Sequence, residues 1–219
     1  MTPEPPEPPE PPEPPVPLGL VWYVGYGSNL SAARFATYLD GGRPVGGSLD
    51  HVGARDRRRP RRDVAVDLPG SVYFAGDSAQ WGGGGVAFYD HDVPGPAAGR
   101  AYLLTLGQLV DVARQEMHHP RLADDPLEVV LAAPLEHGRH EVGPGRYETL
   151  LEVGRLEGLP LLTFTTAGGS RAVPHTVPSA AYVETLVVGL RESRGWDRAR
   201  SLAYLRAAAP PATGGPLSG

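Results

Sequence analysis

The chain has 219 residues, of which 41% are hydrophobic, and a formal net charge of −5. This length predicts one domain with a core of ordinary size, and the acidic balance disfavours nucleic acid or an anionic membrane as the main partner. Cysteine is absent, which excludes disulfides, thiolate catalysis and cysteine-bound zinc. All 20 basic residues are arginine, which excludes a Schiff-base lysine and the lysine of a P-loop.

The N-terminal segment has a composition unlike the rest of the chain. Residues 2–17 repeat Pro-Pro-Glu, and they predict an extended polyproline II tail because proline withholds its N–H and the glutamates repel one another. The tail is either a ligand for a partner that binds proline-rich segments or an extension without function. We therefore divide the chain into a disordered tail over 1–17, one domain over 18–208 and a disordered tail over 209–219. No apolar run of about 18 residues and no signal-peptide order is present, which predicts a cytoplasmic protein.

A strand, a glycine-containing turn and a helix open the domain. Residues 20–24 predict a buried strand, and residues 31–39 predict a helix. Between them, the backbone N–H groups of Gly27, Ser28, Asn29 and Leu30 can point together towards a carboxylate or phosphate; we call these four amides the cradle. The turn lacks the third glycine of a dinucleotide fingerprint, the lysine of a P-loop and the flanking glycines of a hydrolase elbow. An ordinary capped turn is the open alternative.

Six arginines gather in residues 55–62 (RDRRRPRR). Such a cluster binds an anion or nucleic acid, or it forms a solvated loop. Because the cluster is isolated, is interrupted by Pro60 and belongs to an acidic chain, we favour the solvated loop.

Short strands dominate the middle of the chain and helices punctuate it. Strands are expected over 64–68, 71–75, 86–89 and 100–105, and residues 147–156 and 159–166 predict a hairpin. Helices are expected over 106–117, 179–191 and 196–207, from their apolar spacing and the N-cap serine at 179. This mixture predicts an α+β fold with a mostly antiparallel sheet or small barrel.

The titratable side chains offer few candidates for chemistry. Adjacent His118 and His119 diverge by about 100° on a helix, and His137 and His140 lack a third ligand at a suitable spacing, so no metal site is predicted. Glu116, at the end of its helix, is either a general base or an ordinary solvent-facing glutamate.

Several segments in order resemble the gamma-glutamylcyclotransferase-like family over roughly residues 21–205. The segments are Tyr26-Gly27-Ser28-Asn29-Leu30 after a strand, the loop 81–85, Gly99–Tyr102, Glu116, Tyr147, Pro178–Tyr182 and Gly189–Glu192. The resemblance implies a small twisted, mostly antiparallel β-barrel flanked by helices. It also implies an active site between the YGSN turn and Glu116.

Family members convert γ-glutamyl amides to 5-oxoproline and a free amine without a cofactor. The resemblance therefore implies a small-molecule γ-glutamyl substrate, with Glu116 as general base and then general acid. It implies substrate binding by Tyr26, Gly27, Ser28, Asn29, Leu30 and Tyr182. The substrate's own α-amino group is the nucleophile, so Ser28 is a positioning residue. The alternatives are a non-catalytic protein that binds an anionic metabolite in the cradle, and a partner-binding protein that uses the tail and the arginine cluster.

Two residues depart from the family pattern. Met117 stands where members with established activity commonly carry glycine, and Thr163 replaces a common tyrosine. The amine half of the substrate and the oligomeric state are left open by the sequence. If the role of Glu116 is correct, its carboxylate should lie within about one water-bridged contact of the space above Gly27–Asn29.

Overall fold

The computed structural model describes residues 19–208; both predicted tails, 1–17 and 209–219, lie outside the described residues. Its strands are β1 (Leu20–Gly25), β2 (Asp63–Pro69), β3 (Ser71–Ala75), β4 (Val86–Asp90), β5 (Pro96–Thr105), β6 (Arg139–Glu141), β7 (Thr149–Leu156) and β8 (Leu159–Thr165). Its helices are α1 (Ala32–Asp40), α2 (Leu106–Glu116), α3 (Pro126–Leu131), α4 (Ala180–Arg194) and α5 (Arg198–Ala208). Single 3-10 turns are η1 (Ser28–Leu30), η2 (Ala79–Trp81) and η3 (Glu136–Gly138).

The main sheet has six strands in the order β2-β5-β1-β8-β7-β6, and β3 and β4 form a separate two-stranded sheet. Strands β1 and β8 are parallel, and the other neighbours are antiparallel. The predicted α+β class and mostly antiparallel sheet are confirmed. The sheet is open, since its edges β2 and β6 do not pair with each other, so it is not a closed barrel.

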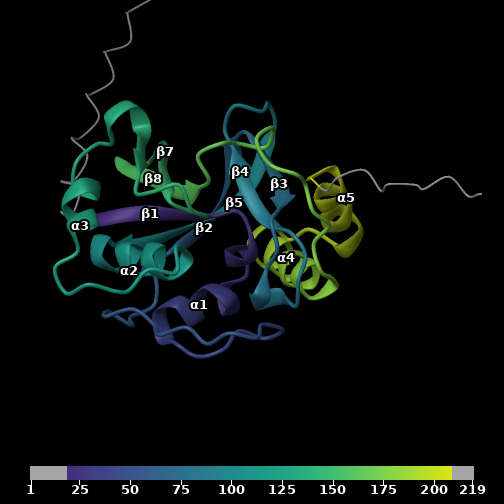
Figure 1. The fold of residues 1–219 in the computed structure, drawn as a ribbon, viewed down its shortest axis with the longest axis horizontal. Coiled ribbons are helices and arrows are strands. Elements are labelled where there is room, and N and C mark those ends of the chain that lie inside the picture. The colour runs from purple at the N-terminus through teal and green to yellow at the C-terminus, as the bar shows by residue number, and fades with distance from the viewer. Residues whose placement is uncertain (1–18, 209–219) are drawn as a thin grey trace, which may run out of the picture.

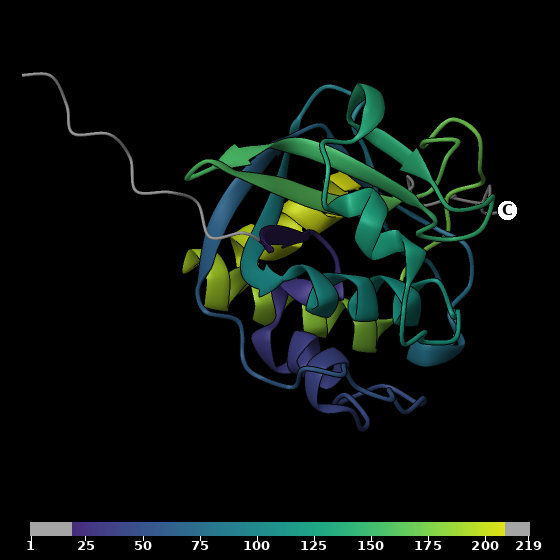
Figure 2. The ribbon, with the colours of Figure 1, turned by 90° about the vertical axis from the view of Figure 1, so that its left-hand side faces the viewer.

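Strand β1 runs through the middle of the sheet and is buried along its whole length. Leu20, Trp22 and Val24 contribute to one hydrophobic core, which also contains residues of α4, α5 and the β3–β4 hairpin. Val21 and Tyr23 contribute to a second core with α1, α2 and α3. Figure 1 shows α2 and α3 on one side of the molecule and α4 and α5 on the other, and Figure 2 shows the sheet arching over the helices. Because both faces are covered, β1 reads as a continuous apolar run.

Side-chain caps set the starts of helices α1, α2 and α4. The Ser31 hydroxyl accepts an amide at the start of α1, and the Ser179 hydroxyl does the same for α4. Thr105 and Gln108 form a capping box at the start of α2. Each cap satisfies amides that the first helical turn leaves unpaired. Within residues 19–208, no helix is long and apolar enough to cross a membrane.

Some elements differ from the expectation. No partners were predicted for β2 and β3, which follow each other closely; β2 pairs with β5, and β3 pairs with β4. Helix α3 and strand β6, which contains His140, were not predicted. These elements have six and three residues, which is too short for a periodic pattern to identify them.

The arginine cluster is largely exposed, as expected for a solvated loop, but most of its members form ion pairs. Arg55 contacts Asp111, whose side chain is 1% exposed, and thereby ties the loop to α2. Arg58, Arg59 and Arg62 pair with Asp56, Asp40 and Glu157 at 2.7, 2.8 and 2.9 Å. Carboxylates of this chain thus already neutralise much of the cluster's charge.

Candidate active site

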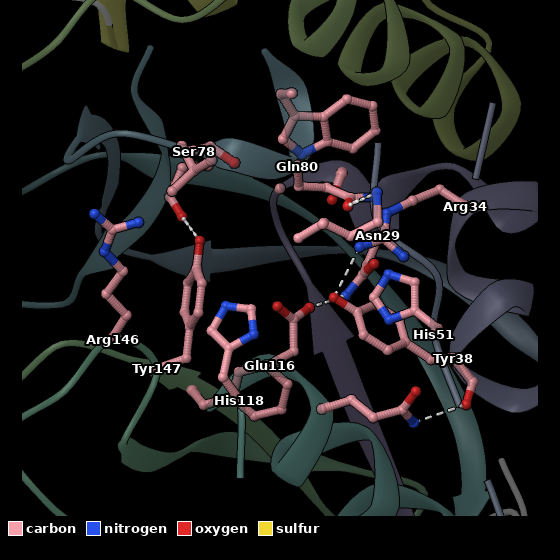
Figure 3. A pocket seen from close by; sticks show the side chains of 18 of the residues that line it. Asn29, Arg34, Tyr38, His51, Ser78, Gln80, Glu116, His118, Arg146 and Tyr147 are labelled. Atoms are coloured by element: carbon pink, nitrogen blue, oxygen red, sulfur yellow. Dashed lines mark hydrogen bonds between the residues drawn. The ribbon is translucent and has the colours of Figure 1, made fainter. Parts of the chain in front are cut away.

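A cavity of about 330 Å³ lies at the carboxyl ends of strands β1 and β8 (Figure 3). Because these two strands are parallel, their carboxyl ends and the loops that follow lie at one edge of the sheet. The walls come from segments far apart in the sequence: the turn 27–29, helix α1, residues 49–52, the turn around η2, strand β4 and the end of α2. Tyr147, Phe164 and Tyr182 complete the lining.

The carboxylate of Glu116 is held directly by the turn that follows β1. Asn29 Nδ2 donates to Glu116 Oε1 at 2.9 Å and to Tyr23 Oη at 2.8 Å. Asn29 is 4% exposed, while Glu116, the last residue of α2, is half-buried and lines the cavity. The carboxylate therefore lies within the predicted limit of one water-bridged contact from the turn.

The turn itself is a single 3-10 turn, and this geometry changes the membership of the cradle. The Leu30 N–H donates to the Gly27 carbonyl at 2.9 Å, and the Leu30 side chain is fully buried in the core. Leu30 does not line the cavity, whereas Gly27, Ser28 and Asn29 do. We expected the Leu30 amide to bind substrate as part of the cradle, and this expectation is corrected because the amide is already bonded to the Gly27 carbonyl. We restrict the cradle to the amides of Gly27, Ser28 and Asn29, of which the Ser28 amide also bonds to the hydroxyl oxygen of Tyr182.

Tyr182, at the start of α4, points its hydroxyl at the same turn. Its Oη accepts the Ala87 N–H at 3.1 Å, and a Cβ added at Gly27 would lie 3.0 Å from this oxygen. The absence of a side chain at Gly27 therefore permits the close approach. Burial, helped by the Glu116 carboxylate, raises the pKa of Tyr182 to about 12. The phenol keeps its proton at neutral pH and can donate a hydrogen bond to a ligand.

Tyr26 lines the cavity with its ring but uses its hydroxyl elsewhere. Its Oη donates to the Phe164 carbonyl at 2.8 Å, and its ring packs against Tyr89 at a centroid distance of 5.7 Å. Burial raises the pKa of Tyr26 well above its usual value. Tyr26 thus joins the turn to the end of β8 and shapes the wall.

Sequence reasoning did not single out four further lining residues, Arg34, Tyr38, His51 and Gln80. Tyr38 Oη accepts Arg34 Nη2 at 2.8 Å, and the guanidinium carbon lies 4.3 Å from the Tyr38 ring centroid. The i,i+4 spacing of Arg34 and Tyr38 on the helix after the turn is the signal that could have identified this pair. No comparable local pattern marks His51 or Gln80.

The adjacent histidines follow the end of α2, so they are not on a helix as the sequence reasoning assumed, and both line the cavity. His118 is exposed, whereas His119 Nε2 lies 2.9 Å from a carboxylate oxygen of Glu148. Within residues 19–208, the one group of three side chains spaced to hold a metal ion is Asp90, His91 and Asp92, and it does not line the cavity. Asp90 is buried and the other two are exposed, and we assign no role to this group.

Both residues that depart from the family pattern, Met117 and Thr163, are buried. Met117 is 5% exposed and packs in the core that includes α1, α2 and α3. Thr163 Oγ1 donates to the Val24 carbonyl at 2.8 Å. Neither residue lines the cavity.

Comparison with known proteins gives one fold and one distant relative. No protein-family model matches the chain. A solved structure of a gamma-glutamyl cyclotransferase superposes with a TM-score of 0.51 at 15% identity, covering 91% of this chain and 94% of the other. An uncharacterized protein from Homo sapiens superposes with a TM-score of 0.50 at 16% identity and the same coverage. The chain therefore has a gamma-glutamyl cyclotransferase-like fold.

The relative in sequence carries a different name. Histone deacetylase 5 of Arabidopsis thaliana is 29% identical over 203 residues, covering 84% of this chain. The chain spans 30% of the length of that relative.

Proposed function

We propose that this protein is a cofactor-free cyclotransferase that converts a γ-glutamyl amine or peptide to 5-oxoproline and a free amine. The proposal rests on one arrangement: Glu116, whose carboxylate is held by Asn29, lines one cavity together with Gly27, Ser28 and Tyr182. The fold is also that of a protein named gamma-glutamyl cyclotransferase.

In the proposed reaction the substrate attacks itself. The α-amino nitrogen forms a bond to the γ-carbonyl carbon and closes a five-membered ring, while the bond between that carbon and the leaving nitrogen breaks. Holding both groups within one molecule supplies much of the rate enhancement. Glu116 takes a proton from the α-ammonium group and returns it to the departing amine nitrogen. The second proton, which the ring nitrogen loses after the attack, passes to the released amine, which leaves as an ammonium ion. Ser28 then acts in positioning, since no nucleophile from the protein is needed.

The remaining groups bind and orient the substrate. The amides of Gly27, Ser28 and Asn29 hold the anionic part of the glutamyl group. Tyr182, protonated at neutral pH, donates a hydrogen bond to a substrate oxygen. Asn29 Nδ2 holds the Glu116 carboxylate in place. Donors that are already oriented need no reorganisation as charge develops, which favours the transition state.

The test is release of 5-oxoproline from a panel of γ-glutamyl amines and peptides. Glu116→Gln keeps the shape of the side chain but removes its basicity, and we expect product formation to fall on the order of 10²–10⁴-fold while substrate binding is retained. Glu136→Gln, at a side chain that is 91% exposed, is the matched control and should match the unsubstituted protein.

One result separates this function from its alternative. If no member of the panel yields 5-oxoproline, the enzymatic function is refuted. Saturable binding of panel members by that inactive protein would then support a non-catalytic protein that binds an anionic metabolite. The deacetylase name of the Arabidopsis relative is not carried over, because this chain spans 30% of that protein.

A further inference from the structure

Unpartnered polar atoms are concentrated around the cavity. Among residues 19–208, four buried side-chain atoms that belong to residues lining it have no hydrogen-bond partner: Asn29 Oδ1, Arg34 Nε, His51 Nε2 and Gln80 Nε2. Buried polar groups are normally paired. The last three belong to side chains that the mechanism proposed above does not use.

Arg34 provides a buried positive charge. It is 6% exposed, and within residues 19–208 no carboxylate lies within ion-pair distance of it. Burial acts to lower the pKa of Arg34, but Tyr38 and Glu116 outweigh it and the pKa is raised. Its two terminal nitrogens donate to Thr37 Oγ1 and Tyr38 Oη at 2.9 and 2.8 Å. A buried guanidinium without a counter-ion is costly, so an anion in the cavity would relieve it.

His51 lies beside Arg34 and offers a hydrogen bond without adding charge. Its ring packs edge-on to Tyr38 at 4.4 Å, the same ring over which the Arg34 guanidinium lies. Burial and the Arg34 charge lower the pKa of His51 to about 4. The imidazole is neutral at physiological pH, so one of its nitrogens carries a proton that it can donate.

The amide of Gln80 has a defined orientation. Its Oε1 accepts the Leu49 N–H at 2.8 Å, which leaves Nε2 as the free end. Trp81, the next residue, packs 5.9 Å from the Arg34 guanidinium carbon. Figure 3 shows Arg34 and His51 on the side of Glu116 away from Arg146 and Tyr147.

We infer that Arg34, His51 and Gln80 form a second anion subsite, which binds a carboxylate carried by the amine half of the substrate. This inference rests on the proposed function, in which the cradle and Glu116 account for the anionic and ammonium groups of the glutamyl half. The subsite formed by Arg34, His51 and Gln80 is then left for the leaving amine. It selects γ-glutamyl derivatives of amino acids or peptides with a free carboxylate, and it repels a cationic polyamine.

Arg146 is the competing cation at the cavity. It is exposed, and its Nη1 donates to the Asp77 carbonyl at 2.6 Å. An exposed guanidinium remains hydrated and gains little from an added anion. The buried Arg34 is therefore the stronger recognition group.

The experiment compares γ-glutamylglycine with γ-glutamylglycinamide, which have the same shape and differ in the charge of one terminal group. We expect kcat/KM to favour the carboxylate on the order of tenfold to a hundredfold. Arg34→Gln should reduce this preference to about twofold or less, and Gln80→Leu should reduce it by a smaller factor. Because both compounds are measured with the same variant, a partly unfolded sample leaves the ratio intact. Arg198→Gln, at an exposed ion pair with Glu184, should leave the preference unchanged.

Binding to the Glu116→Gln variant separates the subsite from the reaction. Calorimetric titration with the two compounds reads the preference without turnover. A preference for the carboxylate that Arg34→Gln abolishes would support the subsite even if no 5-oxoproline forms from any compound. The inference is overturned if the unsubstituted protein shows no preference, or if Arg34→Gln weakens both compounds equally, which would mean that Arg34 acts only through Glu116. Loss of the preference in Arg146→Gln alone would also overturn it.

Discussion

Replacing Gly189 by alanine tests how α4 supports the cradle. Gly189 lies inside α4, where alanine normally stabilises a helix by about 1 kcal/mol relative to glycine. Here, however, an added Cβ would lie 2.5 Å from the carbonyl carbon and Cβ of Leu30 and from the amide nitrogen of Ser31. Ordinary contacts between carbon atoms are about 3.5–4.0 Å. Two of the three atoms belong to the backbone, so the turn must move by roughly 1 Å.

The two effects have opposite signs, and their sizes predict the outcome. Overpacking of this kind costs about 1–3 kcal/mol, and a backbone that cannot rotate away places the cost near the upper end. After the helix-propensity gain, we expect a net destabilisation of about 1–2 kcal/mol. This corresponds to a melting temperature lower by about 2–8 °C for a domain of this size. Because Leu30 and Ser31 directly follow the cradle, binding of γ-glutamyl compounds should weaken as well.

The assay is urea unfolding, with Gly107→Ala as the matched control. Gly107 lies in α2, and its added Cβ would meet Glu128 and Arg55 at 3.7 and 3.8 Å, which are ordinary contacts. That variant should be as stable as the unsubstituted protein or more stable by up to about 1 kcal/mol. If Gly189→Ala proved equally stable, the described packing of α4 against the turn would be refuted.

Two further predictions concern buried polar pairs. Arg114→Gln removes two 2.7 Å bonds to the 1% exposed Asp125 carboxylate and should destabilise the protein by roughly 3 kcal/mol at pH 7. The Arg114 guanidinium holds the pKa of Asp125 below its usual value. This stabilisation is therefore present above about pH 4 and is lost as the pH falls through the lower folded-state pKa. In urea unfolding from pH 7 to pH 2, the difference in stability between variant and parent should shrink, and a constant difference would contradict the pairing. Asn29→Leu leaves Tyr23 and Glu116 without their shared hydrogen-bond donor. We expect the free energy of unfolding, measured with urea, to fall by about 1–3 kcal/mol, and the yield of 5-oxoproline to fall as well. An unchanged unfolding midpoint would refute the described network.

Much of the local structure was predictable because short-range patterns determine it. The apolar run at residues 20–24 became the central strand, and serines at 31 and 179 cap the helices that follow them. The helix that carries Glu116 ends at that residue, close to the boundary expected from its apolar spacing. In each case the deciding contacts join residues a few positions apart, so the sequence contains the signal.

The candidate site was predictable only in part. The turn and Glu116 were identified by resemblance, and the structure places them 2.9 Å apart through Asn29. The bonded state of the Leu30 amide was not predictable, because a 3-10 turn and an open cradle have the same sequence signature. The pairing of β2 with β5 was not predictable either, since strand partners depend on which faces are buried.

By itself, the sequence determined the fold class, the starts of the longer helices and the two segments on which the proposed chemistry depends. The tertiary structure alone decided what else lines the cavity, namely the buried Arg34 charge beside His51 and Gln80. These residues come from a helix and two separate loops, and no spacing in the chain relates them. Their proximity arises from the packing of those segments around one end of the sheet, where Arg34 is buried and no carboxylate among residues 19–208 lies within ion-pair distance of it.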